Sequence, residues 1–192
     1  MIEYNYNTMR ILDIGANDGW WYRHTVNTYP QAEFVLIEAN PYNEPALQRL
    51  GVKYHIACLS DQIKQVDFFI TVDNPTSTGA SYYLENTDNF NQDNTRAMEL
   101  TTTTLDTLFP SEVFDFIKMD VQGAEVDIIN GGKQLISKAS RVLLEVPIDG
   151  VEYNLGAPTR AAYFEAMASI GFTNYEVVEN INNLQEDILF TK

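Results

Sequence analysis

Short, almost continuously apolar runs recur along this chain of 192 residues, and they constrain its fold more than any other feature. Such runs are typical of parallel strands that helices cover on both faces. Segments with helical patterns separate most of them, and this alternation predicts a doubly wound, Rossmann-like α/β sheet. The predicted strands are residues 10–14, 34–38, 53–59, 114–119 and 141–146.

The turn residues between these runs mark the ends of the predicted helices. Two late strand-like segments, 175–179 and 187–191, have only a turn at 180–185 between them, which predicts an antiparallel hairpin at the edge of the sheet. Helices are predicted over 20–29, 41–51, 123–137 with an interruption near Gly131 and Gly132, and 158–170.

One region departs from this alternation. The runs 66–72 and 100–105 are strand-like, and the polar segment 73–99 lies between them. We interpret it as an inserted strand pair with a long loop, a kind of loop that is usually functional or mobile. Neither a repeat nor a linker is visible, so residues 1–192 are expected to form a single domain.

The composition, with 45% hydrophobic residues, is that of a folded protein. The net charge of −15 repels nucleic acid and anionic lipid, so neither is expected as a partner. The chain has no apolar run long enough to span a membrane, and its first ten residues lack the apolar stretch of a secretory signal. Its single cysteine, Cys58, lies in an apolar run and is interpreted as a buried structural residue, which favours a cytoplasmic location.

The segment 13–19, Asp-Ile-Gly-Ala-Asn-Asp-Gly, joins the first predicted strand to the first predicted helix. Glycines in such a turn let backbone N–H groups approach a ligand. Gly15 and Gly19 do not follow the G-x-G-x-x-G pattern of dinucleotide sites. Asp13, at the tip of the strand, suits a ligand that carries an amino group or a cationic centre better than it suits a pyrophosphate.

Glu38 ends the second predicted strand, where a carboxylate can accept hydrogen bonds from both hydroxyls of a ribose. It follows Gly19 by about 20 residues, the length that a helix and a loop consume. Alone, each motif also fits a tight turn or a solvated strand end. Together, in this order and spacing, they favour a nucleoside ligand.

Asp120 follows the strand at 114–119, and ligands of open α/β sheets bind at the carboxyl ends of the strands. Its carboxylate could remove a proton from an attacking hydroxyl, or it could cap the helix that begins near Gly123. Glu125 lies in the first turn of that helix, where a negative charge is favourable without any catalytic role.

The segments ILDIGANDG, VLIEANP, TTTTLDTLF and IKMDVQGAEVDIINGG together resemble the FkbM-type family of S-adenosylmethionine-dependent methyltransferases, over roughly residues 10–146. The resemblance implies a seven-stranded sheet with an antiparallel last strand, S-adenosyl-L-methionine as cofactor, and O-methylation of a small-molecule or saccharide hydroxyl. It gives no oligomeric state.

Matched residue by residue, the family places the glycine turn at the methionine part of the cofactor and Glu38 with Ala39 at the ribose. The residues implied at the turn are Asp13, Gly15, Ala16, Asn17 and Gly19. Ser60 and Asp61 are implied near the adenine, and Asp120 near the reaction centre as well as the cofactor. The polar loop between Asp149 and Pro158 departs from the family pattern and is expected to shape substrate choice.

Further candidates are less specific. Glu145 ends the strand at 141–146 and is a candidate catalytic residue, expected to face the same cleft as Asp120. The two carboxylates could bind a divalent metal, but no third ligand stands out, so no metal is predicted. His24 is a candidate general base on the first helix, whereas His55 is interpreted as an ordinary strand residue.

The aromatic side chains near the motifs leave alternatives open. Trp20 or Trp21 could wall off the cofactor, or could pack in the core. Tyr82 and Tyr83 could line a substrate pocket or fold back onto the sheet.

Two rival functions remain. A nicotinamide-dependent oxidoreductase has the same kind of fold, but the missing G-x-G-x-x-G argues against it. A non-catalytic, cofactor-binding scaffold would keep the binding motifs without turnover.

Overall fold

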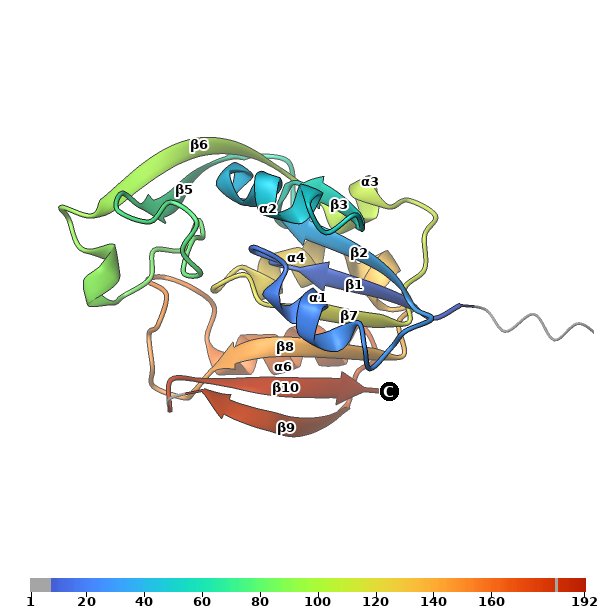
Figure 1. Ribbon diagram of the computed structural model, residues 1–192. Coiled ribbons are helices and arrows are strands. Elements are labelled where there is room, and N and C mark those ends of the chain that lie inside the picture. Colours follow the sequence, from blue (N-terminus) through green and yellow to red (C-terminus); the bar gives the residue numbers. More distant parts are fainter. Residues whose placement is uncertain (1–7, 182) are drawn as a thin grey trace, which may run out of the picture.

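The computed structural model describes residues 8–181 and 183–192, and in this part of the chain a seven-stranded sheet lies between two layers of helices (Figure 1). The strand order is β3-β2-β1-β7-β8-β10-β9. Five neighbouring strands, β3, β2, β1, β7 and β8, are parallel, whereas β10 is antiparallel to both β8 and β9. Their bounds are β1 Arg10–Ile14, β2 Glu33–Glu38, β3 Lys53–Ile56, β7 Phe116–Met119, β8 Arg141–Pro147, β9 Asn174–Ile181 and β10 Gln185–Thr191. The predicted mostly parallel sheet and its terminal antiparallel hairpin are confirmed.

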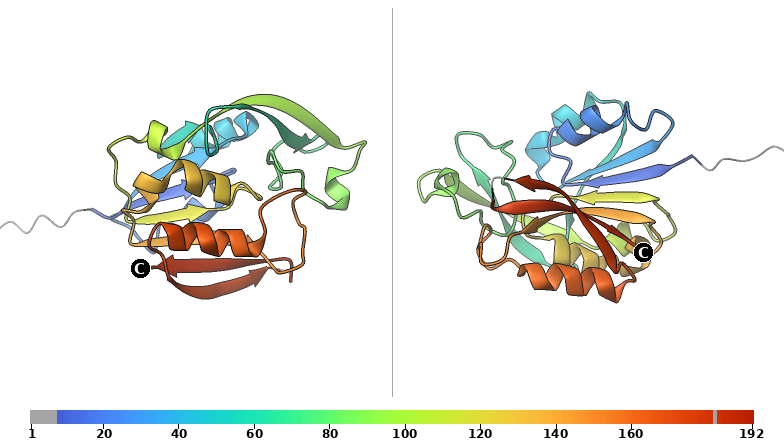
Figure 2. Two further views of the ribbon diagram at one scale, coloured as in Figure 1. Left: turned by 180° about the vertical axis from the view of Figure 1, so that it is seen from behind. Right: turned by 90° about the horizontal axis from the view of Figure 1, so that it is seen from below.

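The helices divide between the two faces of the sheet. Figure 2, from behind and from below, shows α4 and α6 on one face, while α1 and α2 lie on the other. The helices are α1 Trp20–Thr25, α2 Glu44–Gln48, α3 Leu105–Leu108, α4 Glu125–Gly131, α5 Lys133–Ile136 and α6 Arg160–Ser169, with 3-10 turns η1 Pro41–Asn43 and η2 Asp88–Phe90. The break between α4 and α5 at Gly132 confirms the predicted interruption.

Both faces of the central strands are buried, which is why their sequences read as continuous apolar runs. Leu12 and Ile14 of β1 belong to the core beneath α4 and α6, while Ile11 packs with Phe34 and Phe116 on the side of α1. All three β1 side chains are at most 1% exposed. Burial of each contributes roughly 1.5–3 kcal/mol.

A second, three-stranded sheet has the order β4-β6-β5 and projects beyond the carboxyl ends of the parallel strands (Figure 1). It consists of β4 Cys58–Leu59, β5 Gln65–Thr71 and β6 Thr95–Thr103. The prediction of one strand over 53–59 is wrong, because the chain changes sheets at Ala57. The Ala57 N–H donates to the Glu38 carbonyl at 2.8 Å, and Cys58 then pairs with Thr102.

Several element ends also differ from the sequence pattern. The first helix ends at Thr25 rather than near residue 29, and β6 already begins at Thr95, which shortens the inserted loop to 72–94. The short helix α3, which was not predicted, begins where the Thr104 hydroxyl accepts a hydrogen bond from the Thr107 N–H. Residues 1–7 of the polar N-terminal segment, and Asn182 in the predicted turn, lie outside the described residues.

None of the helices in residues 8–181 and 183–192 combines the length and the apolar character that crossing a bilayer requires.

Candidate functional site

A cavity of about 280 Å³, called here the first cavity, opens at the carboxyl ends of β1, β2, β7 and β8. The strand order reverses between β1 and β7, and open α/β sheets bind their ligands at such a reversal. The lining comes from these strand ends, from β4, β5 and the inserted loop, and from α4, the loop after β8, and the ends of β9 and β10 that adjoin one another. It consists of Ile14, Gly15, Asn17, Ile37, Glu38, Ala39, Ala57, Cys58, Leu59, Phe68, Thr78, Ala80, Ser81, Tyr82, Asp120, Val121, Gln122, Ala124, Ile128, Glu145, Tyr153, Ile181 and Gln185.

The turn after β1 packs tightly between β2 and β7. The N–H groups of Gly15 and Ala16 both donate to the Ile37 carbonyl, at 2.9 and 3.0 Å. Gly15 has a φ of 79°, and a Cβ added to it would lie 1.8 Å from the Asp120 carbonyl oxygen. This position therefore requires glycine both for its backbone conformation and for space.

Glu38 holds the same turn from the end of β2. Its Oε2 accepts the Asn17 N–H at 2.7 Å, and its Oε1 accepts the Asn40 N–H at 2.8 Å. The side chain is 7% exposed and lines the first cavity. Burial raises the pKa of Glu38, and these two backbone donors oppose the rise. Each carboxylate oxygen keeps a lone pair that can accept a hydroxyl proton from a ligand.

A buried lysine, Lys118 of β7, links Asp13 and Asp120. Its Nζ lies 3.4 Å from Asp13 Oδ1 and 3.3 Å from Asp120 Oδ2. Asp13 is fully buried, and neither of its carboxyl oxygens has a hydrogen-bond partner among the described residues. Asp13 does not line the cavity but lies behind the turn that does.

The three charges of this cluster shift one another's pKa values. Burial raises the pKa of Asp13, against the attraction of Lys118. Burial opposes the charge on Lys118, but Asp120 and Asp13 raise the pKa of its ammonium above the usual value. Burial would likewise raise the pKa of Asp120, but Lys118 and the Gln122 amide lower it below the usual value. Asp120 is therefore ionised at neutral pH.

A second carboxyl lies close to Asp120 through a shared amide. Gln122 Nε2 donates to Asp120 Oδ1 at 2.9 Å and to Glu145 Oε2 at 2.8 Å. Gln185 Nε2 donates to the same Glu145 oxygen at 2.6 Å. Burial and the charge of Asp120 raise the pKa of Glu145. The pair thus combines an ionised carboxylate with a carboxyl that favours its protonated form, an arrangement suited to acid–base chemistry.

The pattern of the methyltransferase FkbM domain matches residues 13–181, which include all of these groups except Gln185. The chain belongs to the FkbM methyltransferase family. Among curated proteins, no relative matches the sequence.

Solved structures of methyltransferases have a similar fold at low sequence identity. Precorrin-6y C5,15-methyltransferase from Geobacter metallireducens is 13% identical, with a TM-score of 0.56 over 96% of this chain and 79% of that chain. An O-methyltransferase family protein from Burkholderia thailandensis is 9% identical, with a TM-score of 0.58 over 97% of this chain and 51% of that chain, so this chain spans about half its length. The N-terminal domain of EvdMO1 with SAH bound is 15% identical, with a TM-score of 0.51 over 96% of this chain and 74% of that chain. At these identities the similarity extends to the fold alone.

In this FkbM-family chain, Glu125 is a buried support of the turn after β7 and does not line the cavity. Its Oε1 accepts the Val121 N–H at 2.8 Å, and its Oε2 accepts the Gly123 N–H at 3.1 Å and the Tyr163 hydroxyl at 2.7 Å. Burial raises its pKa to about 7. Glu125 therefore positions residues 120–123 rather than contacting a ligand.

Mostly apolar side chains of β4, β5, the inserted loop and α4 form an apolar wall of the cavity: Cys58, Leu59, Phe68, Ala80 and Ile128. Burial raises the pKa of the Cys58 thiol to about 12, so this cysteine is a wall rather than a nucleophile.

Ser60 and Asp61, the residues implied at the adenine, are not part of the lining. Ser60 is buried and its Oγ donates to Asp61 Oδ1 at 3.0 Å, while Asp61 is exposed and pairs with Lys64 at 2.9 Å. Gly19 and Ala16 also lie behind the lining, in the turn itself.

The remaining candidates divide between the cavity and the surface. Tyr82 lines the first cavity, and its hydroxyl, like that of Tyr83, donates to Asp127 Oδ2 at 3.0 Å. His24 is exposed, stacks on Trp20 at 4.0 Å and is not among the lining residues.

The other aromatic side chains pack in the structure. Trp21 packs edge-on against Phe116, and His55 of β3 packs edge-on against Phe109 at 5.2 Å. Within residues 8–181 and 183–192, no group of three or more His, Cys, Asp or Glu side chains is arranged to hold a metal ion.

Sequence reasoning missed Lys118, Gln122, Gln185 and Tyr153. Lys118 and Gln122 lie within the motif at residues 117–125. The one sequence signal for a role of either residue was its closeness to the charged Asp120. Gln185 begins the last strand, where the antiparallel register places it opposite Pro147, two residues from Glu145.

Proposed function

We propose that the chain binds S-adenosylmethionine in the first cavity and catalyses methyl transfer to a hydroxyl of a small molecule or saccharide. The observation that carries the proposal is Glu38, a buried carboxylate at the cavity, which two backbone N–H groups fix in position. Its free lone pairs match the two ribose hydroxyls of a nucleoside.

The donor set fits this cofactor. The apolar part of the lining suits an adenine ring, and Asn17 and Gly15 of the turn after β1 line the same cavity. The buried Asp13 and Lys118 keep the turn after β1 close to Asp120. When it is bound, S-adenosylmethionine supplies an electrophilic methyl group, which leaves the sulfur as a bond to the acceptor oxygen forms.

Asp120 supports a hydroxyl as the acceptor rather than a group that has no proton to lose. A hydroxyl must lose its proton as it attacks, and the ionised Asp120 is placed to accept it. Glu145 lies beside Asp120 through the shared Gln122 amide, and burial and the charge of Asp120 raise its pKa.

The test is transfer of an isotope-labelled methyl group from S-adenosylmethionine to a panel of sugars and phenols. We expect labelled ether products from the unaltered chain. Asp120→Asn removes the proton acceptor and keeps the size of the side chain, so turnover should fall by about 100-fold or more while S-adenosylhomocysteine binding persists. Unchanged turnover in Asp120→Asn would remove Asp120 from the reaction.

A further inference from the structure

A second cavity, of about 290 Å³, adjoins the first. The loop after β8 and the beginning of α6 form it, and Tyr153 and Gln185 line both cavities. A molecule whose hydroxyl lies beside Asp120 can therefore extend past these two side chains into the second cavity.

The cavities offer almost no positive charge to a ligand. Of the described residues that line them, only Arg160 is basic. Its guanidinium is already committed, with Nη2 donating to Glu186 Oε2 at 2.6 Å and Nη1 to the Pro147 carbonyl at 3.2 Å. A carboxylate or phosphate group on the acceptor would meet no free cation here.

Negative charge, in contrast, lies in both cavities. Asp120 lines the first cavity, and the exposed carboxylates of Asp149 and Glu152 line the second. Cavities lined by one sign of charge raise the local concentration of ligands of the opposite sign.

Glu145 adds a specific contact point for a donor. Its side chain lines the first cavity and is 8% exposed. Its Oε2 accepts both glutamine amides, and neither amide occupies its Oε1. A hydroxyl of a ligand can therefore hydrogen-bond to Oε1.

We propose that the two cavities together take a hydroxyl compound that carries a protonated amine, such as an amino sugar. Its reacting hydroxyl lies between Asp120 and Glu145, and its ammonium lies in the second cavity near Asp149 and Glu152. This assignment rests on the methyl-transfer function proposed above and names the class of its acceptor.

Three matched probes test it: the methyl glycosides of glucosamine, glucose and glucuronic acid. Each is titrated into the chain after saturation with S-adenosylhomocysteine, with binding followed by ligand-observed NMR. The amine probe should bind about fivefold more tightly than the neutral probe, and the acid probe should not bind. The preference should shrink as salt is added, because exposed charges are screened.

Two double variants locate the effect. Asp149→Asn with Glu152→Gln removes two charges from the second cavity, and the glutamine keeps the oxygen that accepts the Gly156 N–H. It should abolish the preference for the amine without changing the affinity for the neutral probe. The control, Asp67→Asn with Glu99→Gln, removes two exposed charges from the β5–β6 pair, away from both linings, and should change nothing.

Failure of the acceptor assignment and failure of the proposed function are distinguishable. Absence of S-adenosylhomocysteine binding would overturn the proposed function before any probe is added. With the cofactor product bound, equal affinity for all three probes, no binding of the amine probe, or a preference that survives the double variant would overturn the acceptor assignment.

Discussion

Lys118 is the residue on which the charge balance of the site depends. It is 7% exposed and forms ion pairs with Asp13, behind the turn after β1, and with Asp120, which lines the first cavity. Removing one member of such a buried group leaves the others without compensation. The lysine thereby keeps Asp120 ionised, which a proton acceptor requires.

Lys118→Met should therefore raise the pKa of Asp120. Because the reaction needs the ionised form of Asp120, the acidic limb of the pH profile of kcat/KM should move to higher pH, by about one unit or more. The measurement is kcat/KM against pH for methyl transfer, with thermal melting to confirm that the variant folds.

The control is Lys138→Met, which removes an exposed lysine outside the site and should leave the limb in place. An unshifted limb in a folded Lys118→Met variant would show that the lysine has a purely structural role.

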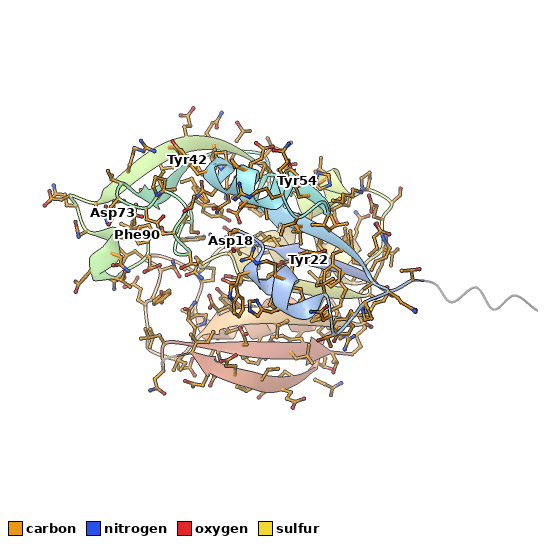
Figure 3. The ribbon with its side chains drawn as sticks, in the orientation of Figure 1. Asp18, Tyr22, Tyr42, Tyr54, Asp73 and Phe90 are labelled. Carbon is orange, nitrogen blue, oxygen red and sulfur yellow. The ribbon has the colours of Figure 1, made fainter. Side chains whose placement is uncertain are left out.

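At the scale of the elements, the inserted loop 72–94 is hydrogen-bonded to the segments that follow β1 and β2. Asn17 Nδ2 donates to the Thr76 carbonyl at 3.2 Å, and Asn40 Nδ2 donates to the Pro75 carbonyl at 2.7 Å. The loop comes from between β5 and β6, whereas the two asparagines follow β1 and β2. Figure 3 labels Asp73 and Phe90 on this inserted segment and Asp18 on the turn after β1.

Asn17→Gly should loosen this contact without disturbing the turn. Asn17 has a φ of 49°, which glycine adopts freely, and its backbone N–H to Glu38 remains. Hydrogen exchange of residues 72–94 should become faster, and S-adenosylhomocysteine should dissociate faster. Unchanged exchange and dissociation would contradict a role of the loop in retaining the ligand.

The elements were more predictable than the contacts between them. The apolar runs indicated the strands of the main sheet and the terminal hairpin, because burial on both faces leaves a plain pattern. The change of sheet at Ala57 was not predictable, since Ile56 and Cys58 are equally suited to one continuous strand. The break arises from the pairing of β4 with β6, a long-range contact.

For the whole molecule, the order of the motifs sufficed to predict the family and the end of the sheet where the site lies. The motifs placed Gly15, Glu38, Asp120 and Glu145 at neighbouring strand ends, and these residues do line one cavity. The sequence could not predict that Ser60 and Asp61 lie outside this lining, or that His24 is exposed. Such details depend on how the inserted sheet and α1 pack against the main sheet.

The net charge of −15 fits the same account at this scale. Among the described residues that line the two cavities only Arg160 is basic, and Glu186 and Pro147 already engage it, so the proposed cofactor would be held by hydrogen bonds and apolar contact. A dinucleotide with its pyrophosphate is therefore disfavoured in the first cavity.

The most direct measurement of the central claim is calorimetric titration of the chain with S-adenosylhomocysteine, beside a nicotinamide dinucleotide. We predict saturable binding of S-adenosylhomocysteine at one site and none of the dinucleotide. Glu38→Gln should weaken that binding by about tenfold or more, while Glu176→Gln on the exposed strand β9 should not. Absence of both heat and a melting shift at about millimolar S-adenosylhomocysteine, where even weak binding stabilises the folded state, would contradict the account.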